Sequence, residues 1–81
     1  RRVLEKQTEG NVLHIQLASQ VSFLNRAALE EVLYNAESGT HVLINATGTE
    51  YIDPDIIALI RDFRDKTAKV RGVTVSTKGC Q

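Results

Sequence analysis

The sequence predicts an α/β domain with a small mixed sheet of four strands in the order β-β-α-β-α-β, and with the helices packed on one face of that sheet. Two observations lead to this fold class. Apolar residues alternate with polar ones in some segments, as in a half-buried strand, and recur every three to four residues in others, as in an amphipathic helix. The length of 81 residues holds one domain with a thin core and leaves no room for a second.

The chain begins with a predicted hairpin. We expect one strand near residues 2–8 and another near residues 11–18, with Gly10-Asn11 as the turn between them. In the second strand apolar residues alternate with polar ones, which is the period-two pattern of a strand with one buried face. The apolar residues of this pattern are Leu13, Ile15 and Leu17.

A helix is predicted near residues 23–37. Its apolar residues recur at helical spacing, and its polar residues fall on the opposite side. Ser22 or Asn25 is suited to cap the beginning of this helix, because a short polar side chain accepts hydrogen bonds from free backbone N–H groups. Ser38-Gly39 is expected to end it.

The second half of the chain alternates strand and helix again. A strand near residues 41–46 has the unbroken apolar centre Val42-Leu43-Ile44, as expected of an interior strand covered by helices. A helix near residues 54–70 follows, Gly72 ends it, and a last strand lies near residues 72–77. Because each helix connects two strands, we expect those strands to run parallel through right-handed crossovers.

The apolar positions of these elements predict the hydrophobic core. We expect most of the core to come from residues on the inner faces of the strands and helices. They are Leu13, Ile15, Leu17, Leu29, Val32, Leu33, Leu43, Ile57, Ile60, Phe63 and Val75.

Composition and charge exclude several classes of protein. Ten basic and ten acidic residues balance to a formal net charge of zero, so the basic surface of a nucleic-acid-binding protein is missing. The longest apolar runs are far shorter than the roughly 20 residues of a membrane span, so we expect a soluble segment that does not insert directly into a membrane. The chain starts with Arg1-Arg2 and contains no methionine, which indicates a piece of a longer protein.

No pattern of residues indicates an enzyme, a metal site or a bound cofactor. His14 and His41 have no further ligand at metal-binding spacing, so both are expected at strand ends or on the surface. Cys80 has no partner for a disulfide and no nearby histidine, and we interpret it as an incidental thiol. No Gly-x-Ser-x-Gly elbow and no glycine-rich phosphate loop occurs in the chain.

The segment between the interior strand and the second helix is the most informative part of the sequence. Residues 46–52 join the carboxyl end of a strand to a helix N-terminus, which is where ligands of open α/β sheets gather. Asp53 and Pro54 are suited to the cap and the first helical position, and Asp55 to the first turn. These two carboxylates would repel a phosphate, so a structural loop is the favoured interpretation.

Two stretches resemble a known family. Asn45–Ile60, NATGTEYIDPDIIALI, is similar to the signature of STAS domains (sulphate transporter and anti-sigma-factor antagonist), in which an Asp-x-Ser-Gly-like loop leads through Ile-Asp-Ser-Ser/Thr into a helix. The segment SFLNRAALEEVL resembles the Phe-x-Asn-x-x-x-Leu motif that opens the first helix in the SulP anion-transporter branch. The resemblance covers residues 3–78, and it implies the same order of strands and helices as the periodicity does.

The sequence departs from the STAS pattern at three positions. Asp53 falls on the aspartate of the family, but Pro54 and Asp55 replace the hydroxyl pair. Asp55 stands where the resemblance places the serine that a kinase phosphorylates in anti-sigma-factor antagonists, so no hydroxyl remains there to modify. Asn45 replaces the usual acid at the end of the strand.

The resemblance implies a non-catalytic regulatory or interaction module of a SulP-type transporter of sulphate, bicarbonate or a related anion. Such a module lies at the cytoplasmic face of the inner or plasma membrane, with the membrane transport domain of the same polypeptide as its partner and a homodimer as a further possibility. Two other functions stay open, an antagonist in a partner-switching pathway and a small ligand-binding domain. The resemblance implies that the regulatory or interaction loop contains Thr47, Gly48, Thr49, Asp53, Pro54 and Asp55.

Overall fold

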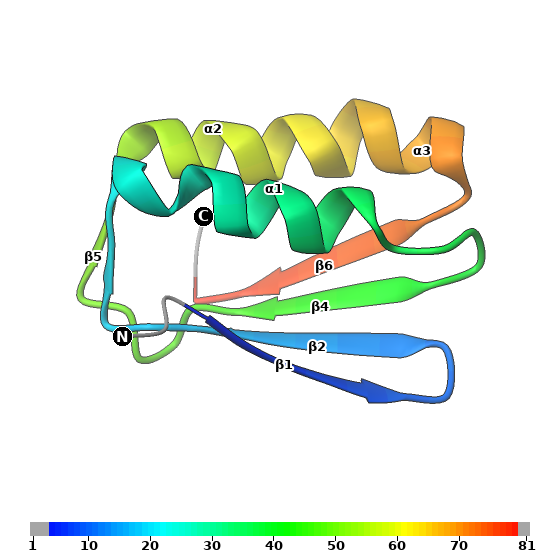
Figure 1. Ribbon diagram of the computed structural model, residues 1–81, viewed down its shortest axis with the longest axis horizontal. Coiled ribbons are helices and arrows are strands. Elements are labelled where there is room, and N and C mark those ends of the chain that lie inside the picture. Colours follow the sequence, from blue (N-terminus) through cyan, green and yellow to red (C-terminus); the bar gives the residue numbers. More distant parts are fainter. Residues whose placement is uncertain (1–3, 80–81) are drawn as a thin grey trace.

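The computed structural model describes residues 4–79 and consists of two layers, a four-stranded sheet and helices that cover one of its faces (Figure 1). The first two strands are antiparallel, and the other neighbouring strands are parallel. The predicted mixed α/β sheet is therefore confirmed, although residues 2 and 3 of the predicted first strand lie outside the described residues. The strands, in their order across the sheet, are β1 (Leu4–Glu9), β2 (Val12–Leu17), β4 (His41–Asn45) and β6 (Thr74–Lys78).

A two-residue turn sets the register of the hairpin. Glu9 pairs with Val12, so only Gly10 and Asn11 lie between the strands. Gly10 has a φ of +60°, a backbone conformation that glycine adopts without steric cost. This register places Leu13, Ile15 and Leu17 on the face of β2 that the helices cover, as the alternation in the sequence predicts.

The first helical segment begins as predicted and ends earlier than predicted. A 3₁₀ turn, η1 (Phe23–Asn25), leads into α1 (Arg26–Tyr34). Ser22 is the residue that caps this segment: its Oγ accepts from the backbone N–H of Leu24 at 3.2 Å, and Asn25 Oδ1 accepts from the backbone N–H of Ser22 at 2.8 Å.

The prediction that Ser38-Gly39 ends the first helix was wrong. The helix stops at Tyr34, and the N–H of Ala36 bonds to the carbonyl of Leu33 at 3.2 Å in a tight final turn. That turn buries Ala36, and the chain then leaves the helix axis. Gly39, with φ of +91°, serves the following turn and donates its N–H to the carbonyl of Gly72 at 2.7 Å.

The second helical segment is one continuous run with a π turn in its middle. Its parts are α2 (Pro54–Asp62), the π-helical η2 (Phe63–Thr67) and α3 (Ala68–Arg71). It ends at Gly72, which is left-handed with φ of +73°, as the sequence predicts. The helix predicted near residues 54–70 is confirmed, and within it the π turn holds one residue more than an α turn.

The π turn changes which residues face the core. Ile56, Leu59, Ile60 and Phe63 follow α-helical spacing on the buried face. Continued spacing would bring Val70 onto that face, since it lies seven positions after Phe63. The extra residue rotates the last turn instead, so that Ala68 is 1% exposed and Val70 is 88% exposed.

An ion pair stands on the outer side of the π turn. Arg64 donates from Nε to Oδ1 of Asp65 at 2.7 Å and from Nη2 to Oδ2 at 3.1 Å. The hydrogen bond with Arg64 holds the pKa of the Asp65 carboxyl below its ordinary value. Because the pKa is lower in the folded chain, this stabilisation is present above the unfolded pKa and is lost as the pH falls through the folded pKa. The pair is exposed, so its contribution is small.

The core lies between the sheet and the helices. Most of the predicted core residues are buried, but Leu43, Ile57, Val32 and Val75 are only partly buried. Leu43 faces the helix-free side of the sheet, because the helices cover only the face that Val42 and Ile44 share. Further buried residues lie outside that list of predicted core residues, namely Val21, Ala36, Val42, Ile44, Ala46, Ile56, Leu59, Ala68 and Val73.

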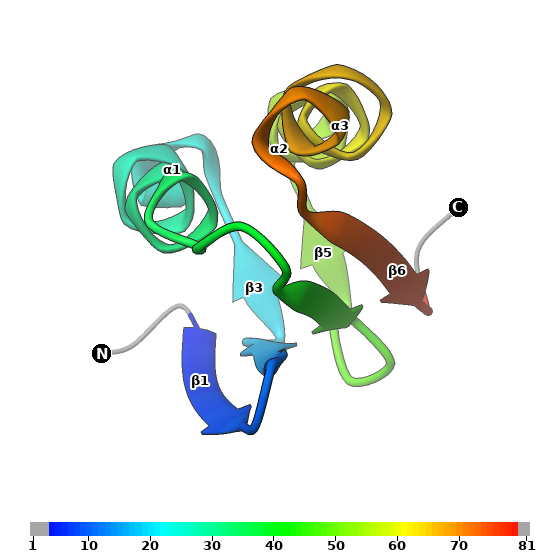
Figure 2. The ribbon, with the colours of Figure 1, turned by 90° about the vertical axis from the view of Figure 1, so that its right-hand side faces the viewer.

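A second sheet, absent from the prediction, joins the two helical segments at their beginnings. β3 (Gln20–Val21) pairs in parallel with β5 (Tyr51–Ile52), and the N–H of Asp53 donates to the carbonyl of Val21 at 2.9 Å. Figure 2 shows the two strands side by side below the helices. The pairing therefore holds the N-termini of η1 and α2 next to each other.

The buried face of α2 gives a test of the packing. Ile60 is 2% exposed, so Ile60→Ala should lower the free energy of unfolding by about 2–5 kcal/mol through lost apolar contacts and a residual cavity. Denaturation in urea measures the change. Val70→Ala is the matched control and should stay within about 0.5 kcal/mol of the parent, because the side chain lies in water. Equal effects of the two substitutions would contradict the assigned helix face.

The π turn gives a second test, on the last turn of the same helical run. Ala68→Leu should destabilise the fold by about 1–3 kcal/mol, because the larger side chain overpacks a filled site. Val70→Asp should change the unfolding free energy by no more than about 0.5 kcal/mol. An uninterrupted α-helix would give the opposite order of effects, with the charged residue at position 70 the more damaging of the two.

Candidate functional site

The predicted loop lies at the end of the molecule where the parallel strands finish and the helical segments begin (Figure 1). β2 and β4 both end there, because parallel strands joined by helices have their carboxyl ends at one edge. The loop from residue 46 to residue 50 leaves β4 at this edge and reaches α2 through β5. Thr47 and Gly48 are exposed, and Thr49 is partly buried.

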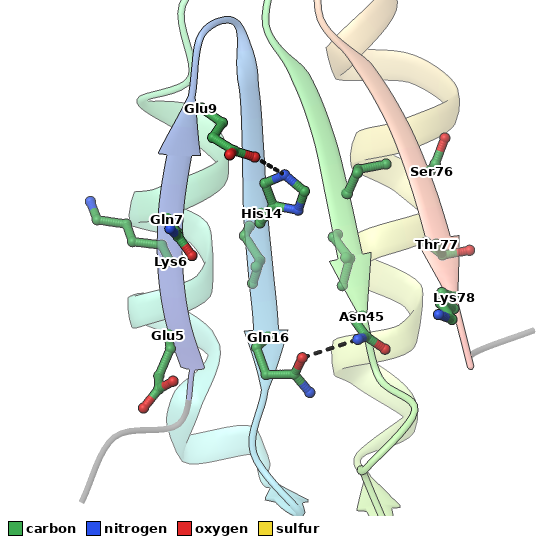
Figure 3. Close-up of a pocket in the computed structure, with 13 residues that line it drawn as sticks. Glu5, Lys6, Gln7, Glu9, His14, Gln16, Asn45, Ser76, Thr77 and Lys78 are labelled. Carbon is green, nitrogen blue, oxygen red and sulfur yellow. Dashed lines mark hydrogen bonds and ion pairs between the residues drawn. The ribbon is translucent and has the colours of Figure 1, made fainter.

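Asn45 shapes the beginning of this loop. Its Oδ1 accepts from the backbone N–H of Thr47 at 2.9 Å, and its Nδ2 donates to Oε1 of Gln16 at 3.0 Å (Figure 3). An amide makes both bonds, whereas a carboxylate at this position would only accept. Asn45 therefore ties the loop to the neighbouring strand β2, a role that the sequence did not indicate because Gln16 is distant along the chain.

Thr49 closes the loop from its other side. Its N–H donates to the carbonyl of Ala46 at 2.9 Å, and its hydroxyl donates to the carbonyl of Ala18 at 2.8 Å. The next backbone N–H groups, those of Glu50 and Tyr51, both donate to the carbonyl of Ser19. Because its hydroxyl proton is already donated to the protein, Thr49 supports the loop and has no hydroxyl donor left for a partner.

A glycine at the end of β6 packs against the same loop. Gly79 has φ of +82°, and a Cβ atom there would lie 2.7 Å from the backbone nitrogen of Thr47. The N–H of Ala46 donates to the carbonyl of Lys78 at 2.7 Å, which holds the two segments at this distance. The loop is thus fixed by backbone contacts on both flanks, through Ser19 on one side and Lys78 on the other.

Asp53 and Pro54 form the predicted helix cap. Asp53 Oδ1 accepts from the backbone N–H of Asp55 at 2.8 Å, and its carbonyl accepts from Ile56 and Ile57 at 2.9 and 3.1 Å. Pro54 stands at the first helical position, where its missing N–H costs nothing. Asp55 is exposed in the first turn, where the helix dipole favours its charge.

The helix-free face of the sheet forms a second surface with polar side chains from all four strands (Figure 3). It holds a shallow depression of about 660 Å³ around the half-buried Leu43. His14 lies there with its Nε2 at 3.6 Å from Oε1 of Glu9, and His41 lies between the hydroxyls of Thr74 and Ser76. The sequence did not single out this surface, because polar residues at alternate strand positions are the ordinary signature of a solvent-facing side.

The two histidines lie on the outer face of the sheet, as expected from the sequence, and within residues 4–79 no three histidine, cysteine or acidic side chains gather where they could hold a metal ion. Cys80 is outside the described residues. The loop surface combines a capped helix with the exposed carboxylates of Glu50 and Asp55.

No family model matches the chain, and no curated protein shows significant similarity to it. In the described part of the chain no helix combines the length and the apolar character that crossing a bilayer requires.

The cap at Asp53 can be tested by substitution. Asp53→Ala should destabilise the fold by about 0.5–2 kcal/mol, because the N–H of Asp55 loses its acceptor. Asp53→Asn keeps an acceptor and should recover most of that loss. Asp55→Ala is the control for charge alone and should cost about 0.3–1 kcal/mol, with the smaller cost at high salt. Thermal denaturation of the three variants ranks these effects, and an Asp53→Asn variant as unstable as Asp53→Ala would contradict the cap.

Proposed function

We propose that this chain is a STAS-type regulatory or interaction module of a SulP-type transporter of sulphate, bicarbonate or a related anion. The observation that carries the proposal is the agreement between the resemblance and the geometry of residues 45–60. The stretch that is similar to the STAS signature forms a strand end, a hydrogen-bonded loop and a capped helix. The strand and helix order of the fold is also the order that the family pattern requires.

The module has a regulatory role in this proposal and carries out no catalysis. Its loop, Thr47, Gly48, Thr49, Asp53, Pro54 and Asp55, lies at the surface with two helix N-termini beside it. The partner is the membrane transport domain of the same polypeptide, at the cytoplasmic face of the inner or plasma membrane. A homodimer of the module is compatible with the same arrangement, whereas nucleic acid is disfavoured by the zero net charge.

Asp55 gives the module a fixed charge in place of a switchable one. A phosphorylated serine would carry a charge of about −1.5 to −2 and three acceptor oxygens, and Asp55 supplies one negative charge at the same position of the family pattern. The carboxylate is exposed on the first turn of a capped helix, so a partner can reach it. Asp55 therefore imitates the sign of that modification but not its full strength, and where it faces a partner its permanent charge would hold the module in one binding state.

An antagonist in a partner-switching pathway is the second candidate. Such a protein releases its partner when a serine is phosphorylated, and the resemblance places that serine at Asp55. Because aspartate has no hydroxyl to modify, the switch is missing and the transporter module is the better proposal. The depression on the helix-free face would favour a small-ligand module instead, but four of its polar side chains already pair with each other, Asn45 with Gln16 and His14 with Glu9.

Anion transport by the full-length protein tests the proposal. Uptake of sulphate and of bicarbonate into vesicles that contain the full-length protein should be measurable, and Asp55→Ala should change the uptake rate without unfolding the module. Asp55→Ser should act in the same direction as the alanine variant. Glu31→Ala is the control, since Glu31 is an equally exposed carboxylate on α1. No uptake of either anion would reject the transporter, and uptake unaltered in both Asp55 variants would reject only the fixed-charge role.

A further inference from the structure

Large apolar side chains are exposed at the same end of the molecule as the candidate loop. Phe23 is 53% exposed, Leu24 is 88% exposed and Tyr51 is 48% exposed. Phe23 and Leu24 belong to η1, and Tyr51 belongs to β5, so all three come from the segments that precede the two helices. Exposed aromatic and leucine side chains that gather at one place mark interaction sites in soluble domains.

The small sheet brings these residues together. Gln20 pairs with Tyr51 and Val21 pairs with Ile52, so η1 starts two residues after the point where the strands are joined. The N–H of Asp53 donates to the carbonyl of Val21 at 2.9 Å, which fixes the beginning of α2 beside the beginning of η1. Backbone hydrogen bonds therefore define the relative positions of the apolar residues, and the surface is formed before any partner arrives.

Carboxylates border this apolar surface. Glu50 and Tyr51 are neighbours in the chain, and Asp53 and Asp55 follow in the first turn of α2. The nearby cation of α1, Arg26, is paired with Glu30 at 3.3 Å. Lys78 ends β6 at the same edge, but its side chain lies on the helix-free face next to Asn45 (Figure 3). The end of the molecule thus combines an apolar centre with an acidic border.

We propose that this end, made by Phe23, Leu24, Tyr51, Glu50, Asp53 and Asp55, is a docking surface for a basic amphipathic segment of another polypeptide. The apolar side of such a segment would cover Phe23 and Leu24, and its lysines or arginines would face the carboxylates. The identity of this segment rests on the proposed function: it is a cytoplasmic loop of the transport domain. Cytoplasmic loops of membrane proteins carry an excess of lysine and arginine, which suits the acidic surface.

The charge of the surface decides between this partner and the alternatives. An anionic lipid surface would repel the three carboxylates while it attracted the apolar residues, so membrane binding is disfavoured. A second copy of the chain, related by a two-fold axis, would bring the same acidic border against itself. A basic segment satisfies both the apolar and the acidic parts at once.

A titration of the 81-residue chain with synthetic peptides tests the surface. The first peptide is an amphipathic helix of leucine and lysine, and the second has the same leucine pattern with glutamate in place of lysine. We expect the lysine peptide to shift the amide resonances of residues 19–25 and 46–56, and to bind at least about tenfold more tightly than the glutamate peptide. The affinity of the lysine peptide should fall as the salt concentration rises.

Substitutions at two equally exposed side chains, Leu24 and Val70, give the decisive comparison of affinity for the lysine peptide. Leu24→Ser should weaken binding of the lysine peptide by about tenfold, as loss of a central apolar contact does. Val70→Ser, at a side chain of the same 88% exposure outside the surface, should leave the affinity unchanged. Amide spectra of both variants check that the fold is retained.

Several results would overturn the proposal. One is equal affinity of the chain for the two peptides, and another is amide resonance shifts that lie on the helix-free face. A third is that Leu24→Ser and Val70→Ser weaken binding of the lysine peptide equally. The fourth is binding of the chain to phosphatidylcholine–phosphatidylglycerol vesicles through the same residues. The peptide experiment does not depend on transport. If the 81-residue chain binds the lysine peptide but the full-length protein transports no anion, the docking surface is retained and the transporter function is rejected. If the full-length protein transports an anion but the chain does not bind the peptide, only the docking surface is rejected.

Discussion

One-sided burial of the sheet is the constraint on which the rest of the structure depends. Both helical segments cross over the same face, so every second residue of β2 and β4 is buried and the residues between them remain accessible. Parallel pairing of β2, β4 and β6 then requires each connection to return across the length of the sheet. As a result both helical segments begin at the same end of the molecule, and the loop, the cap and the small sheet come together there.

Much of this arrangement follows from local patterns in the sequence. The alternation through Leu13, Ile15 and Leu17 predicts both the strand and its buried face, and Asp53-Pro54 predicts the cap and the first residue of α2. Such predictions succeed because the interactions involve residues close together in the chain. The unbroken apolar run at Val42–Ile44 was harder to interpret, since it fits a strand covered on both sides, whereas the helices cover only one.

The features that the sequence did not predict depend on distant contacts or on very short segments. β3 and β5 have two residues each, which is too few for any periodicity to show in the sequence. They form strands because they pair with each other. The π turn puts Val70 in water although its spacing from Phe63 favours burial. At the site, the bond between Asn45 and Gln16 and the close approach of Gly79 to Thr47 join segments that are far apart along the chain. The exposure of Phe23 and Leu24 could likewise not be predicted from the sequence, because apolar residues at the start of a helix are usually interpreted as core residues.

The two open surfaces differ in what a partner would gain from them. On the helix-free face some of the polar side chains are already paired: Asn45 is hydrogen-bonded to Gln16, His41 to Ser76, and His14 lies 3.6 Å from Glu9. A ligand there would have to replace existing hydrogen bonds with new ones, and that exchange brings little net free energy. At the other surface Phe23, Leu24 and Tyr51 leave apolar area in water, and covering them releases about 25 cal/mol for each Å² buried. The carboxylates around them select the sign of the partner's charge. The hydrophobic effect therefore favours the loop end of the molecule as the contact surface, and electrostatics restricts which polypeptides can use it.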